Sequence, residues 1–137
     1  MANSRTSAPA AERTADVAAR HGAAALRTFF QIAEAWHLTG NEQKVLLGLP
    51  RSTLAKYRAD PASARLSVDT AERLSYLFGI YRGLQILLPR PEAADDWVRR
   101  PNDAPPFHGQ SALERMLSGR VADLYTVRHY LDGQRGW

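Results

Sequence analysis

The stretch 67–88, which reads SVDTAERLSYLFGIYRGLQILL, constrains the fold more than any other part of the chain. Ser67 supplies a hydroxyl that caps a helix N-terminus, and Pro89 stops a helix at the other end. Between them, apolar residues recur at the spacing of one helical face, at Leu74, Leu77, Phe78, Tyr81, Leu84 and Leu88. Ile80 and Leu87 widen that face beyond what a surface helix needs. We predict a central helix that is buried on more than one side.

An apolar face of this width has two interpretations, and the sequence leaves both open. In the first, the helix lies in the centre of the chain's own core, with the preceding and following segments packed against it. In the second, part of the same face also pairs two copies of the protein. The second interpretation predicts a homodimer formed through the helical core.

Chain length, cysteine content and the length of apolar runs narrow the class of protein. A chain of 137 residues forms one domain, or two small halves around a shared core. It contains no cysteine, which excludes disulfides and cysteine-ligated zinc. No apolar run approaches the length of a membrane span, and the N-terminus lacks the apolar core of a signal peptide. We predict a cytoplasmic protein with no membrane partner.

Helical periodicity without any strand pattern or internal repeat predicts an all-α fold. Gly22 weakens an Ala-rich helical pattern at 12–20, and a well-formed helix is predicted over 23–36. A last helix starts at Val121, and Gly133 is expected to end it. The predicted divisions are a flexible or partly helical segment at 1–22, a helix-turn-helix domain at 23–66, the central helix at 67–89 and a small helical domain at 90–137.

The segment 39–58, TGNEQKVLLGLPRSTLAKYR, has the pattern of two short helices around a glycine-containing turn. Thr39 or Asn41 is expected to cap the first helix, and Ser52 or Thr53 the second. In a DNA-binding helix-turn-helix the second helix enters the major groove. The residues suited to phosphates and base edges are Lys44, Arg51, Ser52, Thr53, Lys56 and Arg58. A purely structural helix pair that binds no DNA remains the alternative.

The net charge of +4 is too small to identify a nucleic-acid partner, but its distribution is uneven. Residues 41–58 carry Lys44, Arg51, Lys56 and Arg58 against Glu42 alone. Residues 101–137 are balanced between basic and acidic side chains. A basic patch followed by a neutral end fits a protein with two different partners.

Residue patterns that carry catalysis or hold cofactors do not occur in the sequence. The four histidines are scattered, with no pair at i, i+4, so no metal site is predicted. There is no glycine-rich loop followed by lysine and no serine in a nucleophile elbow. We therefore expect a binding protein without cofactor or metal, and not an enzyme.

Motifs in the first half of the chain occur in a recognisable order: WHLT at 36–39, Glu42, LLG at 46–48, PRSTL at 50–54, LS at 66–67 and ERL at 72–74. The second half continues with WV at 97–98, PN at 101–102, Phe107, Gly109, SAL at 111–113, LSG at 117–119, Val127 and Leu131. This order resembles the Xre/MbcA/ParS antitoxins over about residues 25–137. The family often has proline where this chain has Ala112, and proline at that first helical position is only a preference.

The resemblance implies an Xre-like helix-turn-helix followed by a toxin-binding domain, in an antitoxin of a type II toxin–antitoxin pair. The implied partner is a RES-domain toxin, from a family that depletes NAD, whose active-site cleft the antitoxin's C-terminal region covers. Some members of the family also bind their own operator DNA through the helix-turn-helix. A helix-turn-helix transcriptional regulator without a toxin partner is the alternative.

The end of the chain is rich in residue types that dominate protein interfaces. An arginine that enters a pocket built for a phosphate-bearing substrate would meet matching charge. For Trp137 the alternative is an anchor that packs on its own domain. The predicted toxin-binding residues are Arg128, Tyr130, Gln134, Arg135, Gly136 and Trp137.

Overall fold

The computed structural model describes residues 10–136, and the side chains of residues 20–136. In this range the chain is all-α, as predicted; its sole β-type pairing is an isolated bridge between Pro101 and Ser111. The elements are α1 (Ala10–Ala35), α2 (Gly40–Leu47), α3 (Arg51–Ala59), the 3-10 helix η2 (Pro61–Ser63), α4 (Val68–Leu87), α5 (Pro91–Asp96), the 3-10 helix η3 (Trp97–Arg99), α6 (Ala112–Met116) and α7 (Val121–Gln134).

Two glycines that were expected to interrupt helices do not. Helix α1 continues through Gly22, where a Cβ would lie 3.5 Å from the Leu66 side chain. The close contact between α1 and the segment after η2 outweighs the loss of about 1 kcal/mol that a helical glycine brings. Helix α7 likewise continues through Gly133 to Gln134.

The first helix of the helix-turn-helix is capped as the sequence predicts. The Thr39 hydroxyl accepts a hydrogen bond from the Glu42 amide at 3.1 Å, and the Glu42 carboxylate accepts one from the Thr39 amide at 2.9 Å. Gly48 ends α2 in the left-handed region, at φ 66°.

The predicted capping of the second helix by Ser52 or Thr53 is wrong. Helix α3 starts at Arg51, and Pro50 occupies the N-cap position without a side-chain hydrogen bond. Proline has its φ already fixed near the value that precedes a helix, so the helix begins before the two hydroxyl residues. These residues then lie within the first turn of α3.

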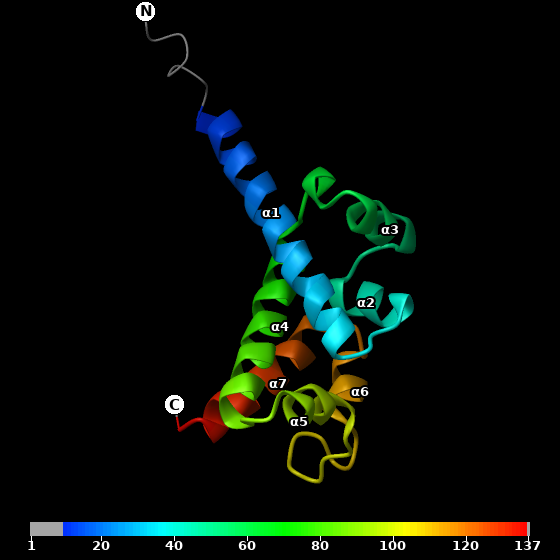
Figure 1. The fold of residues 1–137 in the computed structure, drawn as a ribbon, viewed down its shortest axis with the longest axis vertical. Coiled ribbons are helices and arrows are strands. Elements are labelled where there is room, and N and C mark those ends of the chain that lie inside the picture. The colour runs from blue at the N-terminus through cyan, green and yellow to red at the C-terminus, as the bar shows by residue number, and fades with distance from the viewer. Residues whose placement is uncertain (1–9, 137) are drawn as a thin grey trace, which may run out of the picture.

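Helix α4 is the central helix. The Ser67 hydroxyl caps it by accepting a hydrogen bond from the Thr70 amide at 3.1 Å. Its buried positions include Leu74, Leu77, Ile80 and Leu84, which face the core. Figure 1 shows α1 crossing α4 near its start, α7 beside α4, and the pair α2 and α3 on the other side of α1.

Helices α4 and α7 run in the same direction and pack closely. The Arg128 side chain lies directly over Gly79. At Gly83, a Cβ added to the glycine would lie 3.7 Å from the Cβ of Leu131. Two glycines one helical turn apart on α4 therefore allow α7 to approach.

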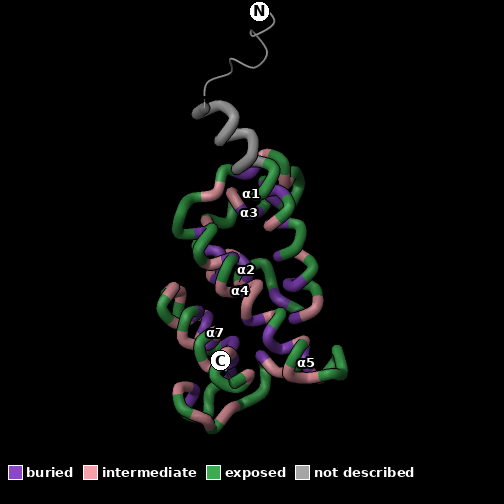
Figure 2. Tube along the Cα trace, turned by 90° about the vertical axis from the view of Figure 1, so that its left-hand side faces the viewer, coloured by how far each residue is buried: buried purple, intermediate pink, exposed green. Residues whose placement is uncertain are grey.

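One hydrophobic core connects both halves of the molecule. It runs from Phe29 and Trp36 on α1 through Leu77 on α4 to Met116 on α6 and Leu124 on α7. Buried positions accordingly recur along all of these helices in Figure 2. The helix-turn-helix and the C-terminal part thus share a core, which agrees with the prediction that both pack on the central helix.

Candidate nucleic-acid and toxin interfaces

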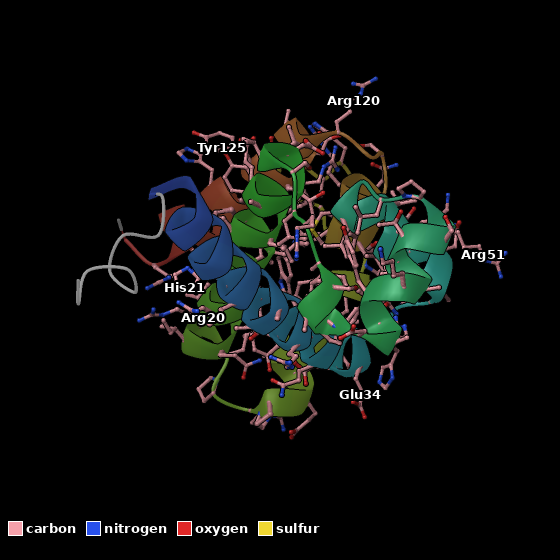
Figure 3. All side chains as sticks on the ribbon, turned by 90° about the horizontal axis from the view of Figure 1, so that it is seen from above. Arg20, His21, Glu34, Arg51, Arg120 and Tyr125 are labelled. Atoms are coloured by element: carbon pink, nitrogen blue, oxygen red, sulfur yellow. The ribbon has the colours of Figure 1, made fainter. Side chains whose placement is uncertain are left out.

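The outer face of α3 carries three of the six predicted DNA-binding residues. Arg51, Ser52 and Lys56 are exposed, while Leu54 and Tyr57 on the opposite side of the helix are buried and fix its orientation. Figure 3 shows Arg51 pointing away from the body of the molecule. Helix α3 therefore presents cationic and hydroxyl side chains to solvent on a rigid support.

A groove of about 690 Å³ lies between α2 and α3. Lys44, Arg51 and Arg58 line it together, so the structure brings three of the six predicted residues to one place. Arg58 is also held by the scaffold, because its guanidinium donates to the Gln43 side-chain oxygen and lies 4.6 Å from the centre of the Phe30 ring. Ser52, Thr53 and Lys56 do not line this groove, and Thr53 is half-buried.

The position of α2 depends on an arginine from the C-terminal part. Arg99 donates to the carbonyl oxygens of Trp36 and His37 at 3.0 and 2.8 Å, and to the Glu42 carboxylate at 3.2 Å. It thereby joins the end of α1 to the start of α2. The sequence does not reveal this role of Arg99, because its partners lie about sixty positions away.

A second group of contacts fixes the other end of α2. Buried Thr70 of α4 donates to the Leu47 carbonyl at 3.0 Å. Arg73 donates to Asp69 and to the Gly119 carbonyl, both at 2.8 Å, and lies against the turn at Gly48. These contacts hold the helix-turn-helix rigidly to α4 and to the segment that starts α7.

The Tyr130 ring, which we predicted to bind a toxin, packs inside an aromatic cluster. The ring centre lies 5.0 Å from that of Phe107 and 6.3 Å from that of Trp97, and Tyr130 is half-buried. This ring stabilises the junction of η3, the loop before α6, and α7. A substitution at Tyr130 therefore tests the fold as well as any interface.

Arg128, another predicted toxin-binding residue, lies across α4. Its Nη1 donates to the Ser75 carbonyl at 3.3 Å, and its Nε lies 3.7 Å from the Asp132 carboxylate. The side chain remains 37% exposed, so one side of the guanidinium still faces solvent. Arg128 is both a packing residue over Gly79 and part of the accessible surface.

The final predicted residues lie at the end of α7. Gln134 and Gly136 are exposed, and Arg135 is half-buried with its side chain near Gly83. Trp137 lies outside the described residues. The structure therefore places Gln134, Arg135 and Gly136 together at the C-terminal end of the helix, one turn beyond Tyr130.

An exposed aromatic group on α4 and α7 was not predicted. Tyr125 is 50% exposed and stacks on His129, with ring centres 5.6 Å apart, while Tyr76 contacts it edge-on at 5.9 Å. The Tyr76 hydroxyl donates to Glu72 at 3.1 Å, and this hydrogen bond to a carboxylate raises the pKa of Tyr76. The four-residue spacing of Tyr125 and His129 was the feature of the sequence that could have predicted this aromatic group.

The turn between α6 and α7 contains a compact ionic network. Asp123 accepts hydrogen bonds from the Ser118 hydroxyl and from Arg115, the latter at 2.8 Å. These two donors, with Ser118 the larger influence, lower the pKa of the Asp123 carboxyl from its ordinary value of 3.8. Arg115 also donates to the Pro106 carbonyl at 2.6 Å, so the network fixes the start of α7.

Two family models match this arrangement of a helix-turn-helix and a helical C-terminal part. The antitoxin Xre-like helix-turn-helix domain matches residues 8–79, and the antitoxin Xre/MbcA/ParS C-terminal toxin-binding domain matches residues 83–136. The chain belongs to the Xre/MbcA/ParS antitoxins, and it is an antitoxin with an N-terminal helix-turn-helix and a C-terminal toxin-binding domain.

A relative in Sinorhizobium fredii (strain NBRC 101917 / NGR234) carries the name Uncharacterized protein y4oB. It is 52% identical to this chain over 114 residues, which are 82% of this chain and 85% of the relative. Among the residues that the structure describes, no helix has the length and apolarity that crossing a membrane requires. The same residues contain no group of three or more histidine, aspartate or glutamate side chains placed to hold a metal ion.

Proposed function

We propose that this antitoxin neutralises a RES-domain, NAD-depleting toxin by covering its active site with the C-terminal end of the chain. One observation supports this mode of action above others. Helix α7 is anchored by Leu124, Val127 and Leu131, and it carries the exposed Gln134 and Gly136 to an edge of the molecule (Figure 1). A rigid helix that ends in a short exposed segment is suited to enter a cleft, because little conformational entropy is lost on binding.

Charge supports the same proposal. Arg135 lies between these two exposed residues, half-buried with its side chain near Gly83, and would have to extend from α4 to enter the cleft. A cleft that binds NAD must accommodate a pyrophosphate, and a guanidinium matches phosphate geometry. The antitoxin then acts by occupying the substrate site, without a reaction or a cofactor of its own. Toxin, antitoxin and operator meet in the cytoplasm in this proposal.

Co-expression with the toxin tests the proposal. A chain truncated after Gly133 should fold but fail to protect cells, because it lacks the segment that fills the cleft. Deletion of residues 2–7, which lie outside both matched domains, is a control of similar size and should preserve protection. Circular dichroism checks that both variants are folded. Full protection by the chain truncated after Gly133 would exclude the tail as the inhibitory element.

We also propose that the helix-turn-helix binds the operator of its own operon. The cationic groove between α2 and α3, together with exposed Ser52 and Lys56, supports this proposal. Fluorescence anisotropy on the upstream intergenic DNA should show weaker binding for Arg51→Ala and Lys56→Ala. If each residue contacts one phosphate, each substitution also lowers the salt dependence by about one ion. Arg120→Ala, an exposed arginine at the start of α7, is the control.

The alternative, a transcriptional regulator without a toxin partner, is distinguished by the neighbouring reading frames. A gene for a RES-like protein beside this one supports the antitoxin–RES pair, and its absence supports the alternative. Homodimerisation also remains a prediction. Most apolar residues of α4 are used in the chain's own core, and Val68 and Ile86 are its large apolar residues that are exposed. Sedimentation equilibrium measures the oligomeric state directly.

A further inference from the structure

A trough of about 870 Å³ runs along α4, with residues of α1 and Arg128 of α7 beside it. We name it the α4 trough. Its floor includes Leu66, Ala71, Leu74 and Phe78, and its walls include His21 of α1 and Arg128 of α7. Figure 3 shows His21 on the side of the molecule opposite Arg51, so the trough lies away from the DNA-facing surface of α3.

The floor of the trough has helical periodicity of its own. Ala71, Ser75, Phe78 and Arg82 follow one another at spacings of three or four residues along α4, and all four line the trough. Ala71, Ser75 and Arg82 are exposed, and Phe78 is half-buried. These eleven residue steps correspond to a length of about 16 Å, or three turns of helix. This length, together with the apolar side chains Leu66, Ala71, Leu74 and Phe78, fits a helix laid along the trough.

The charge of the trough has one sign. Arg65, Arg82 and Arg128 line it beside His21, and among residues 20–136, whose side chains the structure describes, no aspartate or glutamate lines it. The Arg65 guanidinium donates a hydrogen bond to the Ala64 carbonyl at 2.8 Å, and the Arg128 guanidinium forms an ion pair with Asp132. Arg82 forms no hydrogen bond or ion pair with any residue whose side chain the structure describes. It is therefore an uncompensated cation beside an apolar floor.

We infer that the α4 trough binds an acidic amphipathic helix of a partner protein. The apolar side of such a helix would pack on Phe78 and Ala71, and carboxylates along its edges would pair with Arg82 and Arg128. A second copy of this chain is a poorer occupant. Two troughs facing each other across a two-fold axis would oppose cations to cations, and no carboxylate among the described lining side chains would compensate them.

This inference does not rest on the proposed insertion of the tail, because Arg128 is the last described residue of α7 that lines the trough and none of residues 129–136 does. Fluorescence anisotropy with labelled synthetic peptides tests it on the full-length protein. The acidic probe is about four helical turns long, with leucines on one face and glutamates at its edges. The matched probe has lysine in place of every glutamate. The acidic peptide should bind, and the lysine peptide should bind at least about tenfold more weakly.

Two variants localise the binding. Arg82→Glu removes the uncompensated cation, and Ala71→Glu places a carboxylate on the floor; each should weaken binding of the acidic peptide about tenfold or more. Arg27→Glu makes the same charge change at an exposed arginine of α1 that does not line the trough. It should change the affinity by no more than about twofold, since exposed and distant charges are screened.

Several outcomes would overturn the inference. Absence of binding by the acidic peptide would do so, as would equal binding of the two peptides or equal losses in Arg82→Glu and Arg27→Glu. Sedimentation equilibrium tests the other possible occupant of the trough, a second copy of this chain. If the wild-type protein is a dimer that Ala71→Glu converts to a monomer, a second copy fills the trough and the assignment to an acidic helix is wrong.

Discussion

Replacement of Thr70 by valine should destabilise the protein through the loss of one buried hydrogen bond. Thr70 is 1% exposed, and its hydroxyl donates to the carbonyl oxygen of Leu47 at 3.0 Å. It also accepts a longer hydrogen bond, of 3.3 Å, from the less buried Ser67 hydroxyl, which water can replace after the change. Valine has nearly the same shape, so it leaves no cavity. The Leu47 carbonyl belongs to the last turn of α2, where carbonyl groups lack intrahelical partners, and Leu47 is itself fully buried. Water therefore has little access to the acceptor after the change.

The expected magnitude follows from the burial of this acceptor. A buried polar group that loses its partner costs about 1–3 kcal/mol, and we expect about 2 kcal/mol here. For a protein of this size that corresponds to a decrease in Tm of about 8 °C. Urea denaturation and thermal melting measure the two quantities independently.

A matched control is available in the same chain. The Thr126 hydroxyl also donates to a carbonyl at 3.0 Å, but its acceptor is Ala122, one turn back in an exposed part of α7. Thr126→Val makes the same chemical change where water replaces the lost bond, and it should alter the free energy of unfolding by less than about 0.5 kcal/mol. Equal losses in Thr70→Val and Thr126→Val would refute the reasoning, because burial would then not decide the cost.

Three further predictions concern the helix-turn-helix and the turn before α7. Arg99→Ala should lower the unfolding free energy by about 1 kcal/mol, since this side chain is 41% exposed; a double-mutant cycle with Glu42→Gln should assign less than half of that loss to the ion pair. Gly48→Ala should lower the free energy of unfolding, measured by urea denaturation, by about 1–2 kcal/mol, because φ is 66° and a Cβ would lie 2.9 Å from Arg73. Gly40→Ala is the control and should not destabilise the protein, because a Cβ at Gly40 would have no other atom within 4 Å. Because the pKa of Asp123 is lowered in the folded protein, its carboxylate stabilises the fold fully above pH about 4, and this contribution is lost as the pH falls through the folded-state pKa. Asp123→Asn should therefore flatten the pH dependence of Tm in that acidic range. An unchanged slope would contradict the assignment.

Local interactions explain why much of the fold was predictable. The caps at Thr39 and Ser67 and the left-handed end of α2 at Gly48 depend on residues within a few positions of one another. The same holds for the apolar periodicity of α4, whose core positions were largely identified. The order of motifs likewise indicated the antitoxin family, which the two matching domain models confirm.

Contacts between residues far apart in the chain decided the rest. Gly22 does not interrupt α1, because Leu66 packs against it. Tyr130 and Arg128 looked equivalent at the end of the sequence, yet Tyr130 joins an internal aromatic cluster and Arg128 crosses to Gly79 on α4. Periodicity shows which face of a helix is apolar, but it does not show which neighbour covers that face.

The sequence by itself therefore determined the all-α fold, the caps at Thr39 and Ser67 and the class of protein, because these depend on short-range hydrogen bonding and on residue type. Only the tertiary structure decided which cations are held by carbonyl groups, such as Arg99, and which remain available, such as Arg82 in the α4 trough. The physical reason is that the partner of a charged side chain depends on how separate helices pack together. The spacing of residues along a single helix does not determine that packing.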